Sequence, residues 1–219
     1  MSGAELNVPD LFSPDGDEVV LCCFDFDLTL TTIHLHNQLA QLATLGIQRE
    51  TLLERGERWI EAGGLREENK LWPLIVAILE AGHEVAIVTF SAFPELVRVA
   101  LMRGSRILRQ RDIGSTVRRR FAKIPIYFGG PAPSLSPTHP PPHCFEVTGD
   151  HWQTGKGIYI ERAIADREAE SKTRLRPLLI DDDEDNLDAA RALKIEGLFA
   201  PAPPEPASHF DRLRIRLNL

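Results

Sequence analysis

Short apolar runs alternate with helical patterns along most of this chain. The runs predict buried strands, because parallel strands covered on both faces are apolar throughout. Apolar residues with helical spacing fill most of the intervals between the runs. The predicted strands lie at residues 19–23, 85–88, 124–128, 177–180 and 197–200. This alternation predicts an α/β fold with a doubly wound, mainly parallel sheet of about five strands, which is a Rossmann-like arrangement.

Helical patterns of different length lie between and after these strands. Residues 32–65 contain two of them, separated by Gly46, and we interpret this segment as a small helical insertion. Two ordinary connecting helices are the alternative interpretation. The next helix, at 67–80, contains Pro73, so it is either kinked there or begins nearer that residue. The helix that begins at Pro94 either ends at Gly104 or continues through Leu108.

Several segments have weaker patterns. Residues 1–17 are polar and predict a loose lead-in, which leaves one domain at 18–219. In the third strand, Pro125 suits an edge position, where its missing N–H group leaves no partner unsatisfied. The proline-rich stretch 129–143 predicts a loop, and we expect Cys144, which follows it, to lie in a loop as well. A short basic helix is expected at 207–217.

Composition restricts the classes of protein that fit. The chain has 219 residues, 43% hydrophobic and 26% charged, which is ordinary for a globular domain. A net charge of -7 argues against a general nucleic-acid-binding protein. No apolar run is long enough to span a membrane, and the start lacks the features of a signal peptide. Two of the cysteines are expected in a buried strand, so we expect a reduced, cytoplasmic protein.

Two carboxylates follow the first predicted strand at a spacing that would place them on the same side of it. Asp25 and Asp27 come directly after the apolar run, and side chains at i and i+2 of a strand point to the same side. Carboxylates at the end of a buried strand are costly unless a cation or a substrate uses them. In open α/β sheets, ligands bind at the carboxyl ends of the strands. We therefore expect Asp25 and Asp27 at a functional site.

Three further segments carry candidate residues. Thr89 ends the second predicted strand, where its hydroxyl either binds a ligand or bonds to the local backbone. Lys156 begins a helix, a position that the helix dipole disfavours for a cation. Asp182 lies in an acidic run at 181–186 that ends in Asn186, directly after the fourth strand. That run either holds a divalent cation or is a solvated turn that caps the next helix.

Together these segments resemble the four motifs of the haloacid dehalogenase (HAD) superfamily of phosphohydrolases. The resemblance extends over most of the chain, and the motifs occur in the family's order. It implies a sheet with the spatial order fifth, fourth, first, second, third strand. Asp25 and Asp182 would then lie on neighbouring strands, with Thr89 on the other flank. It also implies that the insertion at 32–65 is a small cap over the site.

The resemblance further implies a role for each residue. Asp25 would be the nucleophile, Asp27 the acid and base, and Thr89 and Lys156 would hold the phosphoryl oxygens. Magnesium would be held by Asp25, the Asp27 carbonyl and Asp182. Because Asn186 stands where many members carry an acid, further metal ligands remain open: Asp183, Asp185 and Asn186 itself.

The expected activity is magnesium-dependent hydrolysis of a phosphomonoester through an aspartyl-phosphate. The substrate would be a small phosphorylated metabolite or a phosphotyrosine or phosphoserine side chain of a protein. A phosphotransferase or mutase, or a catalytically weak phosphate-binding scaffold, is the alternative. The strongly basic stretch 98–123 is either a solvated surface or an electrostatic guide for an anionic substrate. The oligomeric state is not indicated by the sequence.

Overall fold

The structure is a computed structural model that describes residues 18–129, 140–148 and 155–219. The predicted lead-in at 1–17 and most of the proline-rich stretch lie outside these residues. In chain order the elements are β1 (Val19–Phe24), α1 (Leu35–Thr44), α2 (Arg49–Glu61), α3 (Glu68–Glu80), β2 (Glu84–Thr89), α4 (Pro94–Leu108), α5 (Ser115–Ala122), β3 (Ile126–Phe128), β4 (Cys144–Glu146), α7 (Gly157–Ser171), β5 (Leu175–Asp181), α8 (Glu184–Ala192), β6 (Glu196–Phe199) and α9 (Ser208–Arg216).

A parallel sheet of six strands forms the centre of the molecule, in the order β4-β3-β2-β1-β5-β6. The α/β fold class is confirmed, and so is the predicted order of the five strands that the sequence indicated. β1 pairs with β2 on one side and with β5 on the other. The carboxyl ends of these three strands therefore lie next to one another, where the candidate residues begin.

The strand count and one edge of the sheet differ from the prediction. The additional strand is β4, and Cys144, which we expected in a loop, is its first residue and is buried. β3 is consequently an interior strand, so the expected edge position of Pro125 is wrong. Pro125 precedes β3, and its carbonyl accepts a hydrogen bond from the amide of Ile87. A three-residue strand within a polar context leaves too short an apolar pattern to be recognised.

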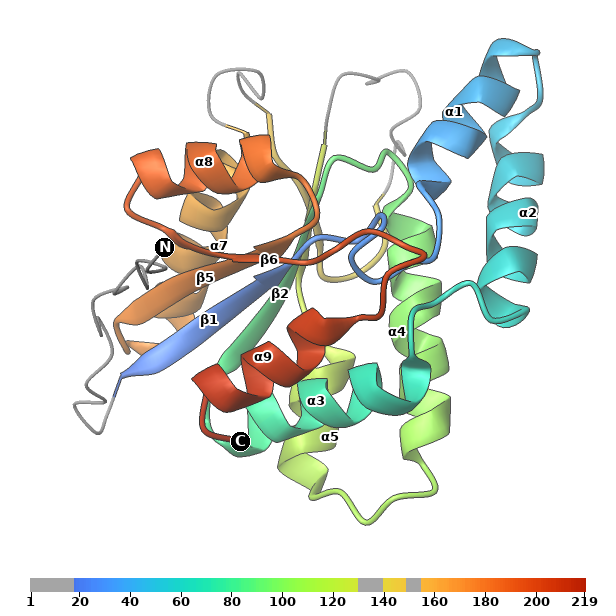
Figure 1. Cartoon of the computed structure of the whole chain (residues 1–219). Helices are drawn as coiled ribbons and strands as arrows, with labels where there is room; N and C mark the ends of the chain where they lie inside the picture. Colours follow the sequence, from blue (N-terminus) through green and yellow to red (C-terminus); the bar gives the residue numbers. More distant parts are fainter. Residues whose placement is uncertain (1–17, 130–139, 149–154) are drawn as a thin grey trace, which may run out of the picture.

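Both faces of the sheet are covered by helices (Figure 1). Because side chains alternate along a strand, Val20, Cys22 and Phe24 of β1 point to one face of the sheet. There they belong to the larger apolar cluster, together with side chains of α3, α4, α5 and α9. Leu21 and Cys23 point to the opposite face, where α7 and α8 pack. Burial on both faces explains why β1 is apolar at every position.

The sequence left open where α4 ends and whether α3 extends through Pro73. α4 continues through Gly104 to Leu108, and α3 continues through Pro73. A Cβ atom at Gly104 would lie 2.6 Å from the indole of Trp72 on α3. Gly104 therefore permits a close contact between the two helices and does not end α4.

The helices α1 and α2 occupy the segment in which an insertion was expected. They form a hairpin beside the carboxyl end of β1 and next to α4 (Figure 1). Gly56 of α2 contacts Leu96 of α4, and Arg49 binds the carbonyl of Ala92 and the carboxylate of Glu95. The hairpin is thus fixed to the core through α4.

Among the helices of the described residues, none is both long and apolar enough to cross a bilayer.

Candidate active site

The site begins where β1 and β5 end side by side. Asp25 directly follows β1, and its amide donates a hydrogen bond of 2.9 Å to the carbonyl of Ile180 on β5. Asp181 is the last residue of β5 and is fully buried. Parallel pairing therefore brings carboxylates from two distant segments of the chain to the same edge of the sheet.

Lys156 joins these carboxylates from the start of α7. Its ammonium nitrogen lies 2.5 Å from Oδ1 of Asp25 and 2.7 Å from Oδ2 of Asp181. The side chain is only 3% exposed, although lysine is rarely buried without a partner. The ring of Phe90 lies 5.3 Å from the same ammonium group and covers it with an aromatic face. Lys156 is thus held between two carboxylates and an aromatic ring.

Asp182 completes a group of three carboxylates. One oxygen from each of Asp25, Asp181 and Asp182 lies within 4.8 Å of the others. The hydroxyl of Thr29, in the turn after β1, donates a hydrogen bond of 3.1 Å to Asp182. The expected proximity of Asp25 and Asp182 is therefore present in the structure.

Sequence reasoning did not select Asp181, although it lies deeper in the site than Asp182. Its Oδ1 atom accepts hydrogen bonds from the amide of Asp183 at 2.9 Å and from the side chain of Asn186 at 3.4 Å. The available signal was its place as the last residue of a buried strand. The family pattern drew attention to the following acid instead.

Two other residues of the acidic run 181–186, Asn186 and Asp183, differ in whether they face the carboxylate group. Asn186 is buried and turned towards Asp181, whereas the carboxylate of Asp183 accepts a hydrogen bond from the amide of Asp185 and caps the first turn of α8. Asp183 is therefore occupied as a helix cap, as the alternative interpretation of the acidic run expected for one of its members.

Asp27 lies against the first turn of α1. Its Oδ1 atom accepts a hydrogen bond of 3.2 Å from the amide of His36, and Oδ2 lies 3.7 Å from Nδ1 of His34. The Asp27 carbonyl accepts a hydrogen bond of 2.7 Å from the amide of Thr29. The two acids of the opening motif thus have different neighbours: Asp25 faces Lys156, and Asp27 faces the start of the helical hairpin.

Thr89 ends β2, on the flank of β1 opposite to β5, as expected. Its hydroxyl accepts a hydrogen bond of 3.1 Å from the amide of Ser91. The hydroxyl hydrogen remains available for a second contact, because this bond uses only a lone pair of the oxygen. Local backbone bonding and ligand binding are therefore compatible at Thr89.

The charges of the site perturb one another strongly. Burial raises the pKa of Asp25 well above its usual range; Lys156 acts in the opposite direction, and the neighbouring carboxylates add to the rise. Burial likewise raises the pKa of Asp182, and the charge of Asp181 adds to it. Burial by itself lowers the pKa of Lys156, but the carboxylates of Asp181 and Asp25 outweigh this effect. The pKa of Lys156 is therefore raised overall. Three carboxylates around one ammonium group leave an excess of negative charge.

Sequence reasoning missed two buried residues, of which Arg66 supports the turn after β1. The guanidinium of Arg66 donates to the carbonyls of Leu28, Pro201 and Glu205 and so joins this turn to the segment before α9. His209 of α9 is fully buried, and burial lowers its pKa to about 3. A single arginine or histidine outside any motif gave no sequence signal.

Part of the basic stretch 98–123 binds other groups of the protein itself, and the remainder is exposed to solvent. Arg103 binds the carboxylates of Glu61 and Glu68, and Arg120 donates to the carbonyls of Leu79 and His83. The stretch ends next to the first residue of β3, so α5 lies towards the amino ends of the strands. This placement favours the interpretation of a solvated surface over that of an electrostatic guide to the acidic cluster.

The donor set fits a divalent cation. Magnesium prefers oxygen ligands, and one cation at the group Asp25, Asp181 and Asp182 would balance its excess negative charge. The Asp27 carboxylate is bonded to the amide of His36 and lies outside this group, whereas the Asp27 carbonyl accepts the amide of Thr29 with one lone pair and keeps a second one for a cation.

Comparison with protein-family models, with curated proteins and with solved structures found no match for this chain.

Proposed function

We propose that the chain is a magnesium-dependent phosphomonoester hydrolase that works through an aspartyl-phosphate. One observation carries this proposal: Asp25 lies 2.5 Å from the buried ammonium group of Lys156, within a group of carboxylates at adjacent strand ends. An ammonium group and a cation site on either side of a carboxylate suit a reaction in which that carboxylate attacks an anion.

Magnesium would be held by the carboxylates of Asp25, Asp181 and Asp182 and by the Asp27 carbonyl, and when bound it would supply neutralisation of the phosphoryl oxygens. This ligand set adds Asp181 to the residues that the sequence suggested. Lys156 would give up part of its contact with Asp25 in favour of the incoming phosphoryl group and hold one of its oxygens. Thr89 would donate its hydroxyl hydrogen to another oxygen.

Asp25 would attack phosphorus and form an acyl-phosphate bond as the P–O bond to the leaving group breaks. Asp27 would give a proton to the leaving oxygen, and burial, which raises its pKa, favours the protonated form that this step needs. In the second step Asp27 would take a proton from water as the water attacks the phosphorus of the acyl-phosphate. Asp25 would then leave as a free carboxylate.

The substrate class remains a choice between a phosphorylated small molecule and a phosphorylated protein side chain. The hairpin of α1 and α2 is joined to α4 and begins beside Asp27, so it would border the leaving group. It is small, and a small cap leaves room for a side chain of another protein.

The test is release of inorganic phosphate from a panel of phosphomonoesters, including phosphotyrosine and phosphoserine peptides, with magnesium present. We expect turnover of at least one class by the wild-type chain and none by Asp25→Asn, with Asp183→Asn as a matched control that retains activity because Asp183 caps α8. Transfer of the phosphoryl group to an added alcohol in preference to water would indicate a phosphotransferase. Equal turnover by the wild-type chain and Asp25→Asn would overturn the proposal.

A further inference from the structure

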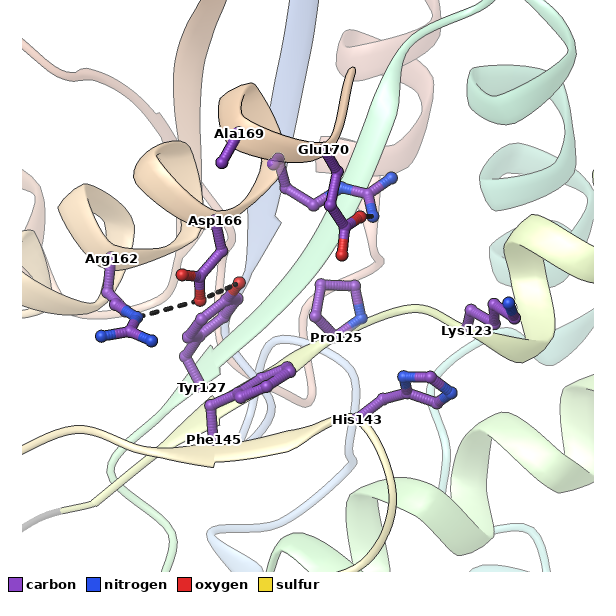
Figure 2. A pocket seen from close by; sticks show the side chains of 10 residues that line it. Lys123, Pro125, Tyr127, His143, Phe145, Arg162, Asp166, Ala169 and Glu170 are labelled. Atoms are coloured by element: carbon purple, nitrogen blue, oxygen red, sulfur yellow. Dashed lines mark hydrogen bonds and ion pairs between the residues drawn. The ribbon is translucent and has the colours of Figure 1, made fainter. Parts of the chain in front are cut away.

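A cavity lies away from the acidic cluster, and none of its lining residues belongs to that cluster. It has a volume of about 480 Å³, within the range of roughly 300–1,000 Å³ that is usual for small-molecule sites. Figure 2 shows it between α7 and the edge of the sheet formed by β3 and β4. Its lining comes from the middle of these strands, from the residues just before them and from the second half of α7.

The cavity arises because the helical layer does not reach the last strand of the sheet. Tyr127 of β3 and Phe145 of β4 are register partners and project from the same face. Tyr127 is covered by α7 and is 1% exposed, whereas Phe145 is 38% exposed. The two rings are stacked, with centroids 5.3 Å apart and planes 24° apart. Phe145 therefore offers an aromatic surface whose inner side is already fixed by Tyr127.

The charged groups at one side of the cavity are satisfied by one another. Asp166 accepts hydrogen bonds from the hydroxyl of Tyr127 at 3.2 Å and from Arg162 at 2.9 Å. Arg167 binds Glu170 at 2.6 Å and also binds Glu84. These pairs form a nearly neutral wall (Figure 2).

The other side has an uncompensated positive charge. Lys123 and His143 lie beyond Pro125 and the ring of Phe145 (Figure 2). Within residues 18–129, 140–148 and 155–219, neither the Lys123 ammonium nor the His143 ring makes a hydrogen bond or an ion pair with another side chain. The cavity thus combines a flat aromatic floor with cationic and N–H donors at one end.

From this arrangement we infer that the cavity is a binding site for a small aromatic anion, whose flat ring lies on Phe145 and whose anionic group faces Lys123 and His143. The aromatic floor selects a flat ring, because offset stacking is favourable for two planar systems. Lys123 selects an anionic over a neutral group. The site is independent of the proposed hydrolase activity.

The test uses naphthalene-2-carboxylate and its neutral amide, naphthalene-2-carboxamide, as probes, because neither is a phosphomonoester. Each is titrated into the full-length ¹⁵N-labelled chain while backbone amide shifts are recorded. We expect the carboxylate to shift the signals of β3, β4 and the second half of α7, and to bind more tightly than the amide. No binding of the carboxylate at millimolar concentration, or shifts confined to the region of Lys156, would overturn the inference.

Variants test separately the stacking of the ring on Phe145 and the attraction of the anionic group to Lys123. Phe145→Ala should weaken binding of both probes by about tenfold, and Phe145→Leu, which retains apolar cover, should weaken it less. Lys123→Gln should weaken the carboxylate by about threefold to tenfold and leave the amide unchanged. Arg109→Gln removes one exposed basic charge outside the lining and serves as the control. Unchanged carboxylate affinity in either Lys123→Gln or Phe145→Ala would contradict the proposed contacts.

Discussion

At the residue scale, the two acids of the opening motif differ in what surrounds them. Asp25 contacts Lys156 and the carboxylate group, and Asp27 contacts the start of α1. In the proposed mechanism these different surroundings would give the two acids separate chemical roles, one as a nucleophile and one as a proton carrier.

These roles predict different behaviour of two isosteric variants. Asp25→Asn should abolish both turnover and covalent phosphate, because it removes the attacking oxygen. Asp27→Asn should still be phosphorylated by an ester with a good leaving group, while breakdown of the acyl-phosphate slows by roughly 10²–10⁴-fold. Intact mass spectrometry and peptide mapping should then find the added phosphate on Asp25. A trapped phosphate on Asp27 would reverse the assignment.

His209 predicts a pH dependence of stability. Its pKa is lowered from 6.5 to about 3 by burial, so below pH 6.5 the unfolded chain binds a proton that the folded chain does not. The free energy of unfolding should therefore fall as the pH decreases from 6.5 towards 3, by about 1.4 kcal/mol per pH unit. Above pH 6.5 this residue should contribute no pH dependence.

The measurement is urea unfolding of the wild-type chain and of His209→Leu at several pH values. The difference between the two should change by about 2 kcal/mol between pH 6.5 and pH 5, with the wild-type chain losing more stability. Other titrating groups cancel in this comparison. A constant difference across that range would show that His209 titrates normally in the folded protein.

At the scale of elements, the contact between α3 and α4 depends on the absence of a side chain. Alanine at Gly104 would gain up to about 1 kcal/mol in helix propensity. Its Cβ, however, would meet three atoms of the buried Trp72 indole at 2.6–2.9 Å. Such overpacking typically costs about 1–3 kcal/mol, so we expect Gly104→Ala to destabilise the protein on balance.

Gly114→Ala is the matched control. A Cβ at Gly114 would meet no atom within 4 Å, and its φ of -56° is accessible to alanine. The expected loss is a few tenths of a kcal/mol, from the N-terminal cap position of α5. Urea unfolding should separate the two variants, and equal stabilities would show that α4 moves away from Trp72 without cost.

At the scale of the whole molecule, the sheet brings together carboxylates that oppose folding unless their charge is balanced. A cation bound only by the folded chain stabilises it by about 2.7 kcal/mol at a concentration 100 times its dissociation constant. Excess magnesium should therefore raise the melting temperature above that in chelator by roughly 5–10 °C. Asp182→Asn should reduce this shift, because it removes one charged ligand of the group.

Activity supplies an independent readout of the same cation. Chelation should abolish hydrolysis, and added magnesium should restore it, whereas calcium should substitute poorly because it prefers more ligands and a looser geometry. Full hydrolysis in excess chelator, together with an unchanged melting temperature, would contradict a metal-dependent site.

The sequence by itself determined the fold class and the positions of five strands, whereas the spatial order of those strands was what the family resemblance implied. Apolar runs such as the one in β1 were sufficient, because a strand buried on both faces leaves a continuous local pattern. The residues alone placed Asp25, Lys156 and Asp182 at strand ends or a helix start, where ligands bind in open α/β sheets, and the resemblance implied that the three belong together. Such signals are local, so they survive without knowledge of the contacts.

Only the tertiary structure decided features that depend on distant neighbours. The pairing of Asp181 with Lys156, the placement of Asp27 against α1 and the role of Gly104 beneath Trp72 each join segments far apart in the chain. The strand β4 and the cavity beside Phe145 likewise exist because of what packs next to them, and α7 ends its cover before that edge. Sequence spacing specifies which way a side chain points, but the opposing surface determines what it meets.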